Sequence, residues 1–153
     1  MIRVVLAALL AVALLAMAVP ALEHAAAENT DRHARAALTD LAEAANSLAR
    51  EEEVPPPGHP PPQRTVTVAL PPDAATAHPL SAFEIERLDR DSSVARYRFE
   101  DRAMRTHVID VPIVADAADS SRPVRLQGTG ERTLRLTLET DDCGQPVVVA
   151  TRV

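Results

Sequence analysis

Hydrophobic and polar positions divide the chain into an apolar stretch, a segment with helical periodicity and a long region of strand-like alternation. Residues 4–22 contain no charged side chain and consist mainly of Ala and Leu. A helix needs about 20 apolar residues to cross the hydrocarbon core of a bilayer. The pattern therefore predicts a membrane-spanning or signal segment over residues 1–22. The large apolar side chains expected to form the membrane anchor are Val4, Leu6, Leu9, Leu10, Leu14, Leu15, Val19 and Leu22.

The charges that flank this stretch predict its orientation. Arg3 precedes it, and acidic residues follow it from Glu23 onward. Positive residues favour the cytoplasmic side, so we expect a single-pass protein in contact with membrane lipid, with a cytoplasmic N-terminus and the C-terminal domain outside. Small residues near Ala21 and Ala27 also fit a leader cleavage site, which leaves secretion as the alternative. Retention is favoured because the helical pattern continues beyond both sites.

The second part, residues 23–54, predicts an amphipathic continuation of the same helix. No Pro or Gly occurs between residues 21 and 54, and apolar residues recur at steps of three and four, with Asp31 interrupting the stripe. We expect this seam to pack against neighbouring helices, because an isolated helix gains most of its stability from packing. The expected helix-packing seam consists of Ala34, Leu38, Leu41, Ala45 and Leu48.

A proline-rich linker over residues 55–63 follows the helical part. Six of the eight residues 55–62 are proline. Proline fixes φ and lacks an N–H group, so such a run favours an extended conformation. The sequence therefore predicts a spacer that separates a helical rod from a C-terminal head.

Residues 64–153 alternate with period two and predict a small antiparallel β-domain. The clearest alternation lies in 132–140, where Leu134, Leu136 and Leu138 face inward. Pro112, within the strand expected over 106–114, indicates an edge strand or an early end. Nothing helical separates the expected strands, so we predict an antiparallel meander of six or seven strands. The fold class is α+β: a long N-terminal helix (membrane span plus amphipathic extension) followed by a small antiparallel β-sheet. The other expected strands cover residues 64–70, 83–88, 94–100, 124–127 and 147–153.

Charge and composition narrow the possible partners. All 16 basic residues are Arg, and 22 acidic residues give a net charge of −6. A nucleic-acid partner is excluded because phosphate binding needs a basic surface. An acidic, Lys-free chain is typical of proteins from salt-loving archaea, where hydrated carboxylates suit high salt. A GC-rich genome explains the same abundance of Ala, Arg and Pro.

No cluster of residues points to catalysis. Cys143 is the single cysteine, which excludes an internal disulfide and a multi-cysteine metal site. Residues 128–130 are too short for a phosphate loop and suit a hairpin turn, and Asp141 and Asp142 lack the spacing of a calcium loop. We therefore expect no enzyme, no catalytic, cofactor or metal site, no cofactor and no small-molecule substrate. The histidines are scattered without ligand spacing: His24, His33, His59, His78 and His107.

The apolar leader, amphipathic helix, spacer and β-head together resemble the architecture of type IV pilins and pseudopilins. More narrowly, the chain resembles a small uncharacterised family of membrane-anchored proteins in halophilic archaea. The resemblance implies a structural subunit exposed outside the cell, which acts through helix packing and associates with itself or with pilus and secretion assembly proteins. The alternative is a solitary tethered or secreted β-domain with a binding or accessory role.

Overall fold

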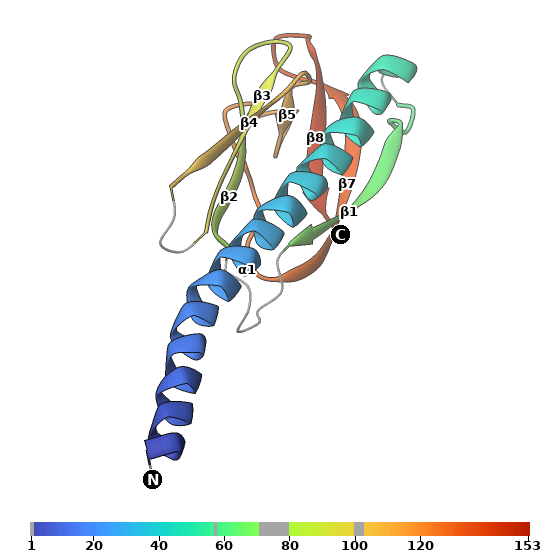
Figure 1. Cartoon of the computed structure of the whole chain (residues 1–153). Coiled ribbons are helices and arrows are strands. Elements are labelled where there is room, and N and C mark those ends of the chain that lie inside the picture. The colour runs from blue at the N-terminus through green and yellow to red at the C-terminus, as the bar shows by residue number, and fades with distance from the viewer. Residues whose placement is uncertain (1, 57, 71–79, 100–102) are drawn as a thin grey trace.

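The fold is α+β, with a long N-terminal helix and two small, mostly antiparallel sheets (Figure 1). The computed structural model describes residues 2–56, 58–70, 80–99 and 103–153, without the side chains of residues 19–24, 26 and 27. The helix is α1 (Ile2–Glu51). Its 50 residues correspond to a length of about 75 Å. The strands are β1 (Gln63–Leu70), β2 (Leu80–Arg87), β3 (Ser93–Phe99), β4 (Arg105–Ile109), β5 (Ile113–Val114), β6 (Val124–Arg125), β7 (Gly130–Thr140) and β8 (Pro146–Arg152).

The strand order differs from the predicted meander. One sheet has the order β1-β7-β8-β5 and the other the order β4-β3-β2-β6. The first strand pairs with the seventh, with Val66 opposite Leu134, and β5 pairs with β8 in parallel. Strands that follow one another in the sequence usually lie side by side. Here β1 and β7 are far apart in the sequence but pair with each other and bury apolar faces, which on β1 consist of Val66, Val68 and Leu70.

The strand predicted over residues 106–114 is two strands in different sheets. β4 ends at Ile109 and lies at the edge of its sheet, as the position of Pro112 predicted. The chain then crosses to the other sheet, where the N–H of Val148 donates to the carbonyl of Pro112 (2.9 Å). Val111 and Ile113 are both buried at this crossing, so the break moves the chain between the two layers without leaving the core.

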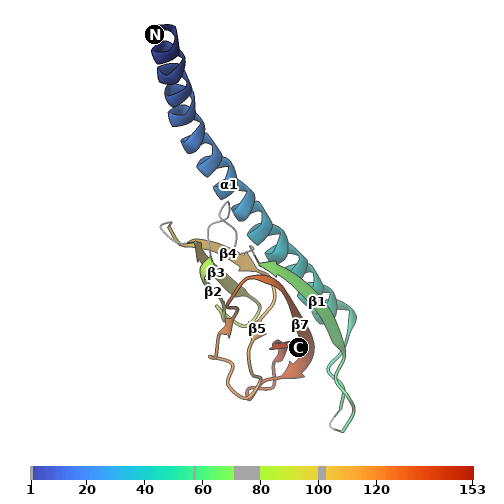
Figure 2. The same cartoon turned by 90° about the horizontal axis from the view of Figure 1, so that it is seen from below.

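The C-terminal half of α1 belongs to the core of the head. The five seam residues, Ala34, Leu38, Leu41, Ala45 and Leu48, are each at most 2% exposed and lie in one apolar cluster with residues of both sheets. The helix packs mainly against β1 and also contacts β7 and β8, as Figures 1 and 2 show. The expectation that the seam packs against neighbouring helices therefore needs correction. Helical periodicity identifies the buried face, but the chain's own sheets cover it.

The proline-rich linker reverses the chain instead of holding the head away from the helix. At the helix end, the N–H of Glu52 donates to the carbonyl of Leu48 (3.2 Å). A turn follows in which the N–H of His59 donates to the carbonyl of Pro56 (3.3 Å). Arg64 then forms an ion pair with Glu51 (2.6 Å), which holds the start of β1 against the end of α1. The reversal lays β1 along the helix (Figure 2).

The N-terminal half of α1 projects beyond the sheets (Figure 1). Across the described residues, no helix is both long enough and apolar enough to span a membrane. This finding contradicts the membrane span predicted within residues 1–22 and the single-pass location inferred from it. Secretion after leader cleavage stays a prediction.

Candidate functional site

The projecting half of α1 exposes large apolar side chains on every side. Ten of them between Ile2 and Met17 are 59–80% exposed. Six belong to the predicted anchor: Val4, Leu6, Leu9, Leu10, Leu14 and Leu15. The side chains of the other two, Val19 and Leu22, lie outside the described part of the chain. Contiguous apolar surface on this scale marks an interaction surface in general.

A polar cluster around Asp31 joins the helix to the β-head where the projecting half begins. The Tyr97 hydroxyl on β3 donates to Oδ1 of Asp31 (3.0 Å), and Arg35 pairs with Oδ2 (2.7 Å). The guanidinium of Arg105, on β4, lies 3.7 Å from Oδ1. The Asp31 side chain is only 17% exposed. The residue that interrupts the apolar stripe in the sequence is therefore the polar attachment between the helix and the second sheet.

Tyr97 is buried among aromatic rings beneath this cluster. Its ring stacks on Phe83, with centroids 6.4 Å apart, and meets Phe99 edge to face at 5.7 Å. Burial raises the pKa of the Tyr97 hydroxyl, the hydrogen bond with Arg35 opposes that rise, and Asp31 adds to it. The pKa of Arg35 is raised by its hydrogen bond to Tyr97 and by the charge of Asp31. Tyr97 therefore stays protonated and serves as the buried donor of the cluster.

The acidic turn after β7 has a structural role. Oδ1 of Asp141 accepts the N–H groups of Cys143 (2.9 Å) and Gln145 (2.8 Å), and Oδ2 pairs with Arg87 (2.7 Å). Arg87 first, and then these N–H groups, lower the pKa of the Asp141 carboxyl. Its oxygens are thus occupied by the fold. The described residues contain no group of three or more His, Cys, Asp and Glu side chains suited to a metal ion.

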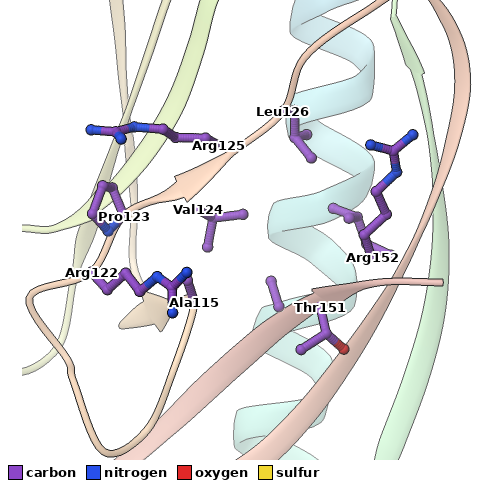
Figure 3. Close-up of a pocket in the computed structure, with 10 residues that line it drawn as sticks. Ala115, Arg122, Pro123, Val124, Arg125, Leu126, Thr151 and Arg152 are labelled. Atoms are coloured by element: carbon purple, nitrogen blue, oxygen red, sulfur yellow. The ribbon is translucent and has the colours of Figure 1, made fainter.

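A pocket of about 380 Å³ lies between the end of β8 and β6 (Figure 3). Arg122 extends along one side of it next to Ala115, and Arg152 rises from β8 on the other side. Arg125 also lines it, but its guanidinium points away from the pocket. No acidic side chain is among the ten described residues that line it. The apolar lining comes from Ala115, Pro123, Val124, Leu126, Leu134 and Ala150.

Sequence reasoning missed this pocket, although a signal was present. Arg152 has the same strand parity as the buried Val148 and Ala150. Likewise, Arg132 has the parity of Leu134 and lies opposite the fully buried Val68. Arg152 is exposed and Arg132 is partly buried, so both arginines stand where the rows of core side chains end. Two such positions at the ends of adjacent strands indicate a polar opening in the core.

Neither the curated proteins nor the solved structures contain a match to this chain. One family model, described as a domain of unknown function, matches residues 1–153, and the chain therefore belongs to this family, DUF7311.

Proposed function

We propose that this protein is a structural subunit that associates with copies of itself through the projecting half of α1, in the manner of a pilin-like protein. The β-head would then decorate an assembly whose centre is a bundle of apolar helices. The observation that carries the proposal is the exposure of ten large apolar side chains between Ile2 and Met17. Leaving such side chains in water costs about 1.5–3 kcal/mol each relative to burial.

Copies of the same helix are the occupants that this surface suits best. The sheets of the chain itself do not cover it, because they pack on the C-terminal half, where Leu41 is already fully buried. Large residues such as Leu6 and Leu10 alternate with small ones such as Ala7 and Ala11. Small side chains let helices approach closely and receive the large side chains of a neighbour. A helix that is apolar on all sides also needs several neighbours, which favours a bundle over a pair.

Association in aqueous buffer tests the proposal. We would replace the exposed Cys143 by serine and place single cysteines at Ala7 or Ala11. The matched control is a cysteine at Asp40, which is exposed on the same helix beside the head. We expect disulfide cross-links between chains at the two alanine positions and none at Asp40.

Two substitutions make the test specific. Leu10→Glu and Leu14→Glu together place charges on the projecting half, and we expect them to abolish the cross-links and reduce the assembly to a monomer by light scattering. Ala36→Glu, at an exposed position of the helix beside the head, should change neither. Equal cross-linking at Asp40 would indicate non-specific aggregation, and a wild-type monomer at high concentration would contradict self-assembly.

A further inference from the structure

The pocket between β6 and β8 lies at two open strand edges. β8 pairs with β7 along its whole length, but β5 covers its other edge only at Val148 and Val149. From Ala150 to Arg152 that edge has no strand partner within the described ranges. β6 is the last strand of the other sheet and, among the described strands, pairs only with β2. Backbone N–H and C=O groups on both sides of the pocket are thus available to an additional strand.

The walls between these edges are apolar and belong to the core. Val124 and Leu126 extend from the β6 side, and Leu134 and Ala150 from the sheet opposite; all four are at most 5% exposed. Because side chains of a strand alternate between its two faces, every second residue of an added strand would face these walls. The site therefore suits an extended segment that carries small or medium apolar residues at alternate positions.

The charges at the rim select for an acidic segment. The guanidinium groups of Arg122 and Arg152 form no ion pair with any residue in the described parts of the chain. Arg125 is 3.4 Å from Glu84, in a pair whose two side chains are 65% and 36% exposed. In a chain with a net charge of −6, this cluster is a local positive region. Arginine presents a planar set of donors that matches a carboxylate.

A buried hydrogen-bond donor without a partner lies near the pocket, and it supports a binding site there independently of the charges at the rim. Arg132 precedes Leu134 by two residues on β7 and has the same strand parity. Its Nε is buried without a hydrogen-bond partner. Its guanidinium packs against Gly128, just after β6. Buried donors are nearly always satisfied in folded proteins. An acceptor brought by a bound molecule would satisfy this one.

We propose that the notch formed by β6, the end of β8, Arg122 and Arg152 binds an extended acidic peptide segment, which adds as a strand to the edge of β8. Main-chain hydrogen bonds to the open edges would provide affinity, and carboxylates on the arginines would provide selectivity. A nucleic acid suits the notch less well, because its phosphate backbone cannot form the alternating N–H and C=O hydrogen bonds of an added strand. This site is separate from the projecting helix and does not depend on self-assembly.

Fluorescence anisotropy with synthetic peptides tests the proposal. The probe is a labelled, end-blocked peptide of about eight residues, an ordinary strand length, in which Glu alternates with Val and Ala. We expect it to bind the full-length protein, and to bind more weakly as salt increases. Replacing each Glu by Lys should abolish binding. Methylating alternate backbone nitrogens, which keeps every carboxylate but removes donors along one edge, should abolish it as well.

Protein variants locate the site. Arg122→Glu combined with Arg152→Glu should weaken binding of the Glu peptide by at least about tenfold. Arg135→Glu, at an exposed position on β7 outside the pocket, should leave it unchanged. Amide hydrogen exchange should slow at residues 150–152 on binding. Equal binding of the Lys peptide, equal binding by the double variant, or full competition by free glutarate at the same concentration would overturn the proposal.

Discussion

The hydroxyl of Tyr97 on β3 donates a 3.0 Å hydrogen bond to the carboxylate of Asp31 on α1. This bond joins the second sheet to the helix, whereas β1, β7 and β8 hold the helix from the first sheet. Asp31 also pairs with Arg35, one turn further along α1. The direction in which the projecting half leaves the head is therefore fixed by contacts to both sheets.

The ionisation of Tyr97 provides a direct test of this attachment. Tyr97 is the only tyrosine and the chain has no tryptophan, so tyrosinate absorbance reports this residue alone. Burial raises its pKa above the ordinary value of 10.0. Above pH about 10 the unfolded chain therefore binds fewer protons than the folded chain, and stability falls as the pH rises. We expect the tyrosinate signal to appear at higher pH in the folded protein than in denaturant.

Asp31→Asn is the matching variant for this titration. Removing the carboxylate charge should lower the pKa of Tyr97, because Asp31 contributes to raising it. Asp40→Asn, at an exposed position on the same helix, should have no effect. Identical titration midpoints in the folded and denatured wild-type chain would show that Tyr97 is not buried beneath Asp31.

Asp141 should make stability sensitive to acid. Its pKa is lowered below the ordinary value of 3.8, chiefly by Arg87. Its contribution is therefore fully present above pH about 4 and is lost as the pH falls through the lowered pKa. Asp141→Asn should reduce the melting temperature by several degrees at neutral pH, and the difference from wild type should shrink below pH about 4. Asp142→Asn, at the exposed neighbour, is the control; an effect as large as that of Asp141→Asn would contradict this interpretation.

Local sequence patterns predicted the helix, the strands and their buried faces better than they predicted which elements lie side by side. The alternation in β7 gave the correct inward face, since Leu134, Leu136 and Leu138 are buried. The same pattern contains no information on which strand lies beside it, and β7 pairs with β1, more than sixty residues earlier. The helical seam has the same limitation. A stripe from Ala34 to Leu48 shows which face is buried, but a neighbouring helix and a sheet cover such a stripe equally well.

The arginine-lined pocket was less accessible to sequence reasoning than the core. Arg152 and Arg132 have the strand parity of buried residues, but Arg152 is exposed, as charged residues near strand ends usually are. Their significance arises from β5, which ends at Val114 and leaves the adjacent edge of β8 open. The early end of a strand depends on where the chain crosses between sheets. No local periodicity encodes that crossing.

The strand register of β7 can be tested with two adjacent substitutions. Leu136 is fully buried between Arg64 of β1 and Ala150 of β8, whereas Arg135 is exposed. Leu136→Asp should unfold the head, because an unpaired buried charge costs several kcal/mol, against a typical domain stability of about 5–15 kcal/mol. Arg135→Asp should change the free energy of unfolding by less than about 0.5 kcal/mol. Urea denaturation measures both, and similar values would mean that the register is shifted by one residue.

The two halves of α1 should respond in opposite ways to the same substitution. Leu41 is fully buried in the core of the head, whereas Leu10 is 63% exposed on the projecting half. Leu41→Glu should destabilise the sheets by about 3 kcal/mol or more, since it removes core packing and buries a charge. Leu10→Glu should leave the stability of the head unchanged within about 0.5 kcal/mol but weaken the proposed self-association.

Circular dichroism during urea unfolding measures the stability of each variant, and light scattering measures its association. We expect Leu41→Glu to reduce the stability of the head, and Leu10→Glu to reduce self-association while leaving that stability unchanged. A folded Leu41→Glu head that has lost only its association would mean that the seam binds neighbouring helices after all. An unfolded Leu10→Glu head would mean that the projecting half contributes to the core. Either result would contradict a helix whose C-terminal half stabilises the head while its N-terminal half remains available to other copies.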